Sequence, residues 1–234
     1  MNIRTESAGG TSAAQGVQAR LEAGERLHVL RPRLIAAFRG SSGQREDRLL
    51  DWKGMYRKKK IIQSDLTGPC TAMLAVPPGY TYYGVRLQEG ESLLVPVRHV
   101  LFYSSGLEMK SMLQRLPQLL ATREWARMRF RGAGVVGMVA QGAVMEMPLV
   151  PEEPLHVDLG SLMAYPEDAR LELCVYGNAL AAQHMNYQWK VTGTGSVLVQ
   201  TGLADPSLES QMREDGVLRR ILREVIPFGS VFIK

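Results

Sequence analysis

Short stretches in which apolar and polar residues alternate recur along this chain. A period of two is typical of a strand that buries one of its faces. The clearest stretch follows a Gly-Glu turn at residues 24–25 and again at residues 90–91, and a weaker copy follows a turn at residues 151–154. Each copy continues as a Leu-x-Val strand. The inward positions that the three copies predict are Leu27, Val29, Leu93, Val95, Leu155 and Val157.

A second block follows each copy at a nearly constant spacing: Gly-Pro-Cys at residues 68–70, Gly-Ala-Gly at 132–134 and Gly-Thr-Gly at 193–195. Two blocks that recur in the same order indicate internal repetition. The chain is therefore predicted to be all-β, with three pseudo-symmetric β modules in the double-stranded β-helix or barrel-like class, related by one pseudo-three-fold axis. The predicted repeats span about residues 17–80, 81–145 and 146–202 of a single domain at 17–234.

Several segments depart from the repeated pattern. Residues 1–16 are small and polar, which predicts a disordered tail. Residues 41–60 are polar and basic and are interpreted as an exposed excursion. Methionines and leucines at helical spacing within residues 107–125 predict a helical insertion. An Asp-Pro pair followed by an apolar stripe predicts a C-terminal helix at about residues 206–226.

Composition favours a globular protein, because 45% of the residues are hydrophobic and 22% are charged. Only Cys70 and Cys174 are present, both among apolar residues, so they are predicted to be buried, reduced thiols. No stretch approaches the roughly 20 apolar residues that span a bilayer, and the N-terminus lacks the apolar core of a signal peptide. A cytoplasmic location without a transmembrane segment is expected.

Charge is distributed unevenly along a chain whose net charge is +5. Residues 31–60 contain ten Lys and Arg, whereas residues 141–172 contain seven Asp and Glu. This asymmetry is compatible with anion binding on one side, with head-to-tail self-association, or with an ordinary solvated surface. The sequence leaves these three interpretations open.

Two motifs resemble sites of chemistry. Residues 132–137 spell G-x-G-x-x-G, but a dinucleotide site needs a helix beginning at the last glycine, and the residues that follow lack a helical pattern. These glycines are therefore predicted to lie in turns or bulges. His28 and His156 occupy matching positions, but the copy that follows Gly90-Glu91 has Leu94 there, so both are interpreted as exposed histidines rather than metal ligands. No catalytic residue, metal ligand or cofactor is predicted.

Three arginines are the best candidate for an anion contact. Arg127, Arg129 and Arg131 alternate with apolar residues, which places their guanidinium groups on one face of a predicted strand. The basic residues of the excursion could assist them. The alternative is a solvated strand face that binds nothing. The candidate anion-contact residues are Lys58, Lys59, Lys60, Arg127, Arg129 and Arg131.

The Gly-Glu turns with Leu-x-Val strands, together with the later glycine blocks and the run Val-Leu-Val-Gln-Thr at residues 197–201, resemble the family named for altered inheritance of mitochondria protein 24. The resemblance covers roughly residues 17–202. It implies a triplicated β fold similar to the subunit of the tryptophan RNA-binding attenuation protein. Eukaryotic members are associated with mitochondrial inner-membrane organisation, and the resemblance implies no enzymatic activity and no catalytic residues.

These observations specify a fold more closely than a biochemical function. The expected function is that of a non-enzymatic scaffold or protein-interaction protein, with homo-oligomerisation as one form of interaction. One alternative is nucleic-acid or anionic-membrane binding through the basic surfaces, which would weaken steeply with salt. Another is small-ligand binding in the β core.

Overall fold

The computed structural model describes residues 1–7, 15–50, 61–113, 126–175 and 187–202. These residues form strands that are joined by turns and by three short 3-10 helices. The all-β prediction is confirmed. In the described part of the chain, no helix is long and apolar enough to span a bilayer.

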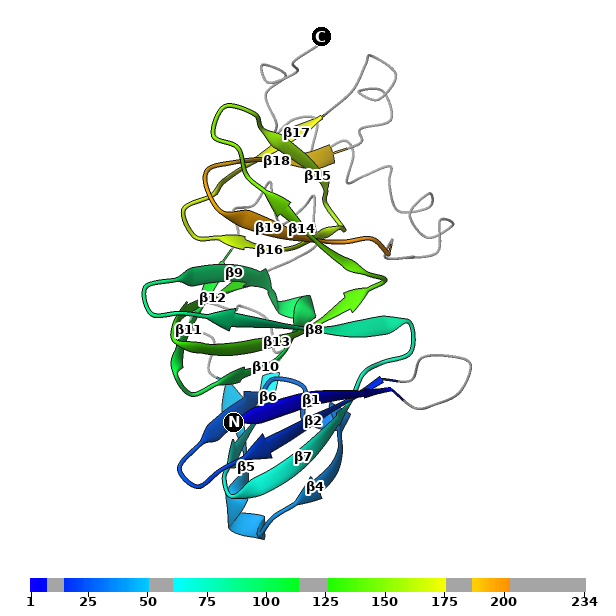
Figure 1. The fold of residues 1–234 in the computed structure, drawn as a ribbon, viewed down its shortest axis with the longest axis vertical. Coiled ribbons are helices and arrows are strands. Elements are labelled where there is room, and N and C mark those ends of the chain that lie inside the picture. Colours follow the sequence, from blue (N-terminus) through cyan, green and yellow to red (C-terminus); the bar gives the residue numbers. More distant parts are fainter. Residues whose placement is uncertain (8–14, 51–60, 114–125, 176–186, 203–234) are drawn as a thin grey trace.

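The strands fall into three consecutive groups of six, called here the first, second and third modules (Figure 1). The first module contains β2 (Gln15–Leu21), β3 (Arg26–Val29), β4 (Ile35–Arg39), β5 (Arg45–Leu50), β6 (Ile61–Thr67) and β7 (Cys70–Ala75). The second contains β8 (Tyr80–Leu87), β9 (Ser92–Pro96), β10 (Val100–Ser104), β11 (Leu107–Leu113), β12 (Ala126–Gly132) and β13 (Gly134–Gln141). The third contains β14 (Val144–Pro148), β15 (Leu155–Asp158), β16 (Leu162–Pro166), β17 (Arg170–Val175), β18 (Tyr187–Thr192) and β19 (Ser196–Gln200).

The pairing inside each module follows the same scheme. The first, sixth and third strands of a module pair in that order, giving β2-β7-β4, β8-β13-β10 and β14-β19-β16. The second, fifth and fourth strands also pair, giving β3-β6-β5, β9-β12-β11 and β15-β18-β17. The third strand carries a register shift in every module, at Ala36, Leu101 and Met163. A bulge at the same place bends each of these strands in a comparable way.

Neighbouring modules are joined because the second strand of one pairs with the third strand of the next. These two junctions are β3 with β10 and β9 with β16. They generate the six-stranded sheets β5-β6-β3-β10-β13-β8 and β11-β12-β9-β16-β19-β14. The modules consequently follow one another along the long axis of the molecule (Figure 1).

The inward positions predicted from the sequence lie on matching strands, β3, β9 and β15. Leu27, Val29 and Val95 are fully buried, and Leu93 and Val157 are nearly so. Leu155 is only half-buried. The prediction of buried positions is therefore confirmed for all of them except Leu155, whose strand has no neighbouring module on its outer side among the described residues.

Three sequence-based predictions are corrected. The described sheets are open, with edge strands at both sides, so the barrel-like part of the fold prediction is wrong for these residues. Residues 107–113 form β11 and pair in register with residues 126–132, so the helical insertion is wrong there. A short apolar run fits a strand as well as a helix, and this cross-strand pairing decides between them.

The expected tail at residues 1–16 is the third correction. Asn2–Ser7 form β1, which pairs in antiparallel register with β2. Backbone pairing with the edge of β2, together with the packing of Ile3 against the first apolar cluster, orders this segment. The predicted C-terminal helix at residues 206–226 and the excursion beyond residue 50 lie outside the described residues.

Candidate functional site

Each module completes the apolar core of the module before it. Leu101, Phe102 and Val139 belong to the second module but are buried in the apolar cluster of the first. Met163, Ala164 and Leu198 of the third module enter the cluster of the second in the same way. Burying a large apolar side chain contributes about 1.5–3 kcal/mol. Apolar side chains are therefore packed inside each junction, and neighbouring modules share a hydrophobic core.

The first junction also contains a polar network. The ring of His28 on β3 packs against Tyr103 on β10, with ring centroids 4.7 Å apart. His28 Nδ1 lies 2.6 Å from Asp65 Oδ1, and Arg48 Nε lies 2.6 Å from Asp65 Oδ2. The Tyr103 hydroxyl donates to Gln63 Oε1 at 3.4 Å. Burial, reinforced by the negative charge of Asp65, raises the pKa of Tyr103 to about 12, so its phenol stays protonated and able to donate.

The second junction uses an arginine at the position equivalent to Gln63. Arg127 Nη1 donates to the Tyr165 hydroxyl at 2.5 Å. The guanidinium carbon lies 5.1 Å from the centre of the Tyr165 ring and 4.7 Å from that of the Trp189 ring. Such stacking of a cation on aromatic faces is favourable by about 0.5–2 kcal/mol. Arg127 therefore links β12 of the second module to β16 and β18 of the third.

This geometry corrects the interpretation of the three arginines as one solvated strand face. Arg127 is only 6% exposed, and Arg129 Nη1 donates to Glu167 Oε1 at 2.6 Å. That hydrogen bond lowers the pKa of Glu167 below its usual value. Arg131 is the one exposed member of the three. An anion contact through these residues stays a prediction, and Lys58, Lys59 and Lys60 lie outside the described residues.

Arginine side chains also connect the short segments that precede β4, β10 and β16, the third strands of the three modules. Arg31 donates to the carbonyl of Arg98, and Arg98 Nη2 donates to the carbonyl of Gly160 at 3.2 Å. His99 lies beside this chain of contacts and is 3% exposed. Its Nδ1 is 2.9 Å from the Val139 carbonyl, and its Nε2 accepts from Arg98 Nε at 2.9 Å.

The burial of His99, reinforced by the charge of Arg98, lowers its pKa from 6.5 to about 4. Between these two values the unfolded chain binds a proton that the folded chain does not bind. The free energy of unfolding should therefore fall as the pH decreases from about 7 to about 4, with a contribution of about 3 kcal/mol from His99. Urea unfolding of the wild type and of His99→Leu across this pH range measures the contribution of His99.

Leucine is the replacement because Leu34, which precedes β4, occupies the position equivalent to His99 in the first module. An equal pH dependence in both proteins would contradict the assignment.

The glycines of the G-x-G-x-x-G run serve strand packing. Gly132 and Gly134 flank the bend at Ala133 between β12 and β13, as predicted, whereas Gly137 lies inside β13 and not in a turn or bulge. β13 begins at Gly134 without the helix that a dinucleotide site needs. Gly132 has a φ of 111° at the end of β12. A Cβ at position 137 would lie 2.4 Å from Cζ of the Phe102 ring. The third glycine is needed because that aromatic ring lies directly against the backbone.

Gly137→Ala is expected to lower the free energy of unfolding by about 1–3 kcal/mol, since Phe102 is packed on all sides and cannot move away freely. Chemical denaturation measures this change. The matched control is Gly43→Ala, where an added Cβ meets nothing within 4 Å. Equal effects at the two positions would show that the close approach to Phe102 is unimportant.

The histidine and cysteine predictions have mixed outcomes. His28 is part-buried within the first junction, so its interpretation as an exposed residue is wrong. His156 is half-buried, with Nδ1 3.6 Å from Cys174 Sγ. Cys70 and Cys174 are both buried and free, as predicted. Burial raises the pKa of both thiols, which disfavours the reactive thiolate.

The first end of the module series is the outer edge of β4. In β10 every residue is buried, and in β16 all but the last are, whereas β4 exposes Ala36 and Ala37. The residues at these two positions in β10, Leu101 and Phe102, are fully buried by the preceding module. No described strand pairs with the outer edge of β4.

The other end is the outer edge of β15. β3 and β9 each pair with a following module on this side, but β15 pairs with β18 alone among the described strands. Leu155, Leu171 and Leu173 pack against the third apolar cluster without being fully buried. β4 and β15 lie at opposite ends of the long axis (Figure 1). β4 and β15 are thus edge strands, whereas the equivalent strands of the other modules pair with a neighbouring module on that side.

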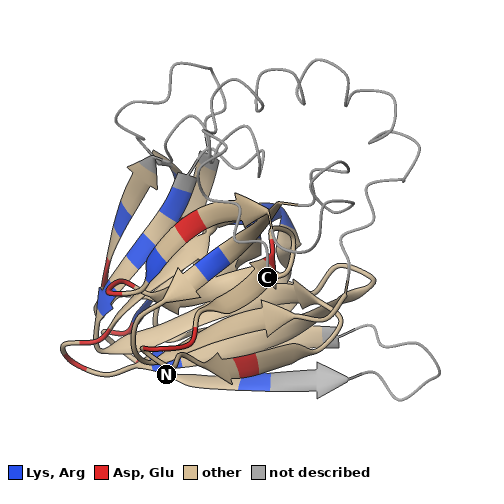
Figure 2. Ribbon diagram, turned by 90° about the horizontal axis from the view of Figure 1, so that it is seen from above, with Lys and Arg blue, Asp and Glu red and all other residues tan. Residues whose placement is uncertain are grey.

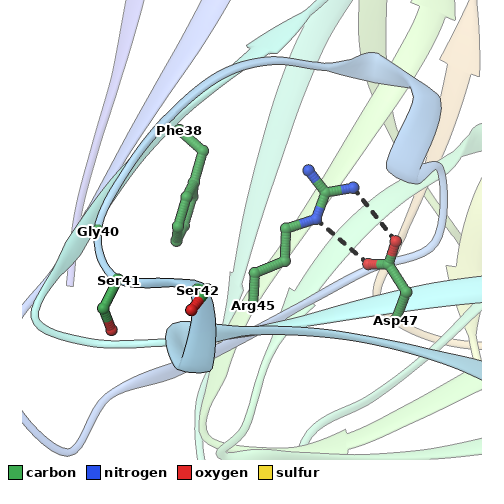
Figure 3. A pocket seen from close by; sticks show the side chains of 6 residues that line it. All are labelled: Phe38, Gly40, Ser41, Ser42, Arg45 and Asp47. Carbon is green, nitrogen blue, oxygen red and sulfur yellow. Dashed lines mark hydrogen bonds and ion pairs between the residues drawn. The ribbon is translucent and has the colours of Figure 1, made fainter.

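An open hollow of about 410 Å³ lies next to β4 (Figure 3). Phe38 lines it together with Arg45 and Asp47, which are joined by hydrogen bonds of 3.2 and 3.3 Å. A hydrogen bond donated by the Ser64 hydroxyl, aided by Arg45, lowers the pKa of Asp47. The carboxylate thus stays ionised and paired, and the hollow presents the aromatic ring of β4 at the end of the module series.

Charged residues are unevenly placed when the molecule is viewed along the module series (Figure 2). Lys and Arg lie mainly on strands at one side, whereas many Asp and Glu lie in connecting loops. Within the described residues, no group of three His, Cys, Asp or Glu side chains could hold a metal ion.

Comparison with known proteins identifies a family and a solved structure that this chain resembles. A crystal structure of a Streptococcus pyogenes protein superposes with a TM-score of 0.65, covering 91% of this chain and 99% of that one at 11% sequence identity. At this identity the likeness shows the fold alone. No curated protein matches the sequence. The model of the family described as "Mitochondrial biogenesis AIM24" matches residues 9–202, and the chain therefore belongs to that family.

Proposed function

We propose that this chain is a non-enzymatic scaffold, built from three repeats of one module, that binds proteins by strand addition at the outer edges of β4 and β15. The observation that carries the proposal is the incompleteness of these two strands. Each internal second or third strand is paired across a junction, while its counterpart at an end of the series lacks such a partner among the described strands. An unpaired edge offers backbone donors and acceptors to an added strand.

The side chains that could perform chemistry support the same proposal, because they are used within the structure. His28 and Asp65 bond to each other in the first junction, and His99 is buried against the Val139 carbonyl. Both pairs are contacts within a module, and they engage these groups in the folded structure. A cytoplasmic location and a similarity to the tryptophan RNA-binding attenuation protein remain predictions.

The test places a photoreactive side chain at Ala37 in the native host, with Lys110 as the control position. Both residues are exposed, but Lys110 lies on β11, whose counterparts β5 and β17 are edge strands too. Protein adducts from Ala37 that exceed those from Lys110 and persist when salt is raised support strand addition. Equal adducts at both positions would contradict it.

The same experiment separates the alternatives. Nucleic-acid or anionic-membrane binding predicts adducts that disappear steeply with added salt, because counterion release drives such binding. Small-ligand binding, expected in the β core, would be tested at the hollow beside Phe38, which lies next to β4. It predicts protection of that hollow by a metabolite and no protein adduct.

A further inference from the structure

We infer that residues 203–234 of this chain cover an exposed apolar stripe at β14. Met145, Met147 and Val150 form this stripe, called here the methionine stripe, and they are 53%, 38% and 50% exposed. The two methionines share one face of the strand and lie opposite Val199 and Val197 of β19. Val197 belongs to the third apolar cluster and Val199 packs against it, so the stripe extends the rim of that cluster into solvent.

The first module shows which element is missing at this place. The strand pairing gives the two methionines counterparts in β2, namely Val17 and Ala19. Both are fully buried, since β1 pairs along the outer edge of β2 and Ile3 packs against the first cluster. Among the described strands, none pairs with the outer edge of β14. The described part of the third module therefore lacks the cover that β1 gives to the first.

The chain passes beside the methionine stripe as it leaves β19. Thr201 N donates to the Ala143 carbonyl at 2.9 Å. Gly202 N donates to the Gln141 carbonyl at 2.8 Å. These hydrogen bonds hold residue 202 next to the residues that lead into β14. A segment that starts at residue 203 is therefore tethered close to the stripe, and tethering gives it a high effective concentration there.

The backbone of β14 favours a cover that packs by its side chains. Leu149 N donates to the Gly195 carbonyl beside β19 at 2.7 Å, so the backbone of the preceding residue, Pro148, faces the outer edge. Proline has no N–H to offer an added strand, and a proline at an edge discourages strand addition. The segment after residue 202 instead has apolar residues at the spacing of one helix face: Leu208, Met212, Leu218, Ile221, Leu222 and Val225.

Charge also favours this contact. Residues 144–153 carry three exposed glutamates and neither Lys nor Arg. Residues 217–226, which form the second half of the apolar pattern, carry three arginines and one glutamate. Opposite charges around an apolar contact favour the correct pairing of two surfaces. The inference is independent of strand addition at β4 and β15, because β14 is a different edge.

The test measures methionine oxidation by hydrogen peroxide in the full chain, residue by residue, with mass spectrometry. Met112 on β11 is the internal reference, because it is 43% exposed and so resembles the stripe. In the wild type, Met145 and Met147 should be oxidised at least about fivefold more slowly than Met112, since a covered thioether is shielded from the oxidant. Leu218→Gln combined with Leu222→Gln should raise both rates to about that of Met112.

The matched control is Arg213→Gln combined with Glu224→Gln. At 100° per residue these two positions lie on the side of the predicted helix opposite to the apolar face, so the control should keep the protection. Met138 is fully buried in β13 and reports on folding, because it must stay protected in every variant. If it does not, the milder pair Leu218→Ala and Leu222→Ala replaces the glutamine exchanges.

Each outcome decides the inference. Protection that the leucine exchanges abolish and the control exchanges keep supports it. Stripe methionines that react as fast as Met112 in the wild type overturn it. Protection that survives the leucine exchanges also overturns it, because another element then covers the stripe. Equal loss of protection in the control shows that the apolar face is not what binds, with the same consequence. Photocrosslinking from Ala37 is unaffected by any of these results, so the scaffold proposal stands or fails separately.

Discussion

Phe102→Ala is expected to lower the free energy of unfolding by about 3–5 kcal/mol, as for other fully buried phenylalanines. The ring belongs to β10 of the second module, but it is buried in the cluster of the first module beside Leu27 and Val29. Its removal leaves a cavity at the junction. The strands on both sides are held in place by their pairing, so the cavity cannot close by collapse. Urea denaturation monitored by circular dichroism measures the change from the shift of the midpoint.

The matched control for this substitution is Phe38→Ala. Phe38 lies on the equivalent strand of the first module but is only partly buried, because no described module precedes it. Its removal should cost less than half as much as removal of Phe102, following the smaller apolar area that it buries. Similar costs for the two phenylalanines would mean that the junction does not act as a shared core.

Trp189→Ala is expected to have a comparable effect, of about 3–5 kcal/mol. Trp189 is 1% exposed on β18 and pairs with Val157 and Leu173 of the strands on either side. Its ring also supports the guanidinium of Arg127 from the second module. The substitution therefore leaves a cavity in the third apolar cluster and also weakens the second junction. Differential scanning calorimetry or urea denaturation measures the total loss.

A double-mutant cycle with Arg127→Met separates these two effects. Methionine keeps much of the side-chain volume but removes the charge and its hydrogen bond to Tyr165. We expect a coupling free energy of about 0.5–2 kcal/mol between Trp189 and Arg127, the range of a desolvated cation–aromatic contact. Strictly additive losses would show that the stacking contributes nothing.

The sequence alone predicts the strands of the repeated blocks well, because those blocks contain turn glycines and alternating apolar residues. Leu27, Leu93 and Val157 are buried as their period of two requires. The pairing of β3 with β10 could not be predicted in this way. It joins strands far apart in the chain, and alternation specifies which face is buried without specifying which strand lies alongside.

The candidate arginines illustrate the same difficulty. Alternation correctly places Arg127 and Arg129 on one face of β12, but this face is covered at Arg127 and partly covered at Arg129. A signal was present in the sequence, since the positions matching Arg127 are the uncharged Gln63 and Gln188. Gln63 is fully buried. Amide side chains at two of three matching positions favour a covered, hydrogen-bonded place over a phosphate-binding one.

The ends of the series could not be foreseen from composition. β4 has the small residues Ala36 and Ala37 where β10 has the large residues Leu101 and Phe102. This difference is recognised only after the two strands are aligned at their bulges. Similarly, β1 forms because the polar residues at 2–7 meet an available edge of β2. Backbone pairing and the packing of Met1 and Ile3 against the first apolar cluster stabilise it, and two apolar residues in a polar segment are a weak signal in the sequence.

The central claim is that one strand junction, repeated along the chain, makes the modules a single continuous scaffold. Residue-resolved native-state hydrogen exchange tests it most directly, through the amides that cross the first junction. Leu30 N donates to Leu101, and Ser105 N donates to Arg26. The account predicts that both amides exchange with the free energy of global unfolding, as do amides in the middle of β13. If they exchange much faster than β13, the modules separate in the folded protein, and the junction cannot be the device that this scaffold uses.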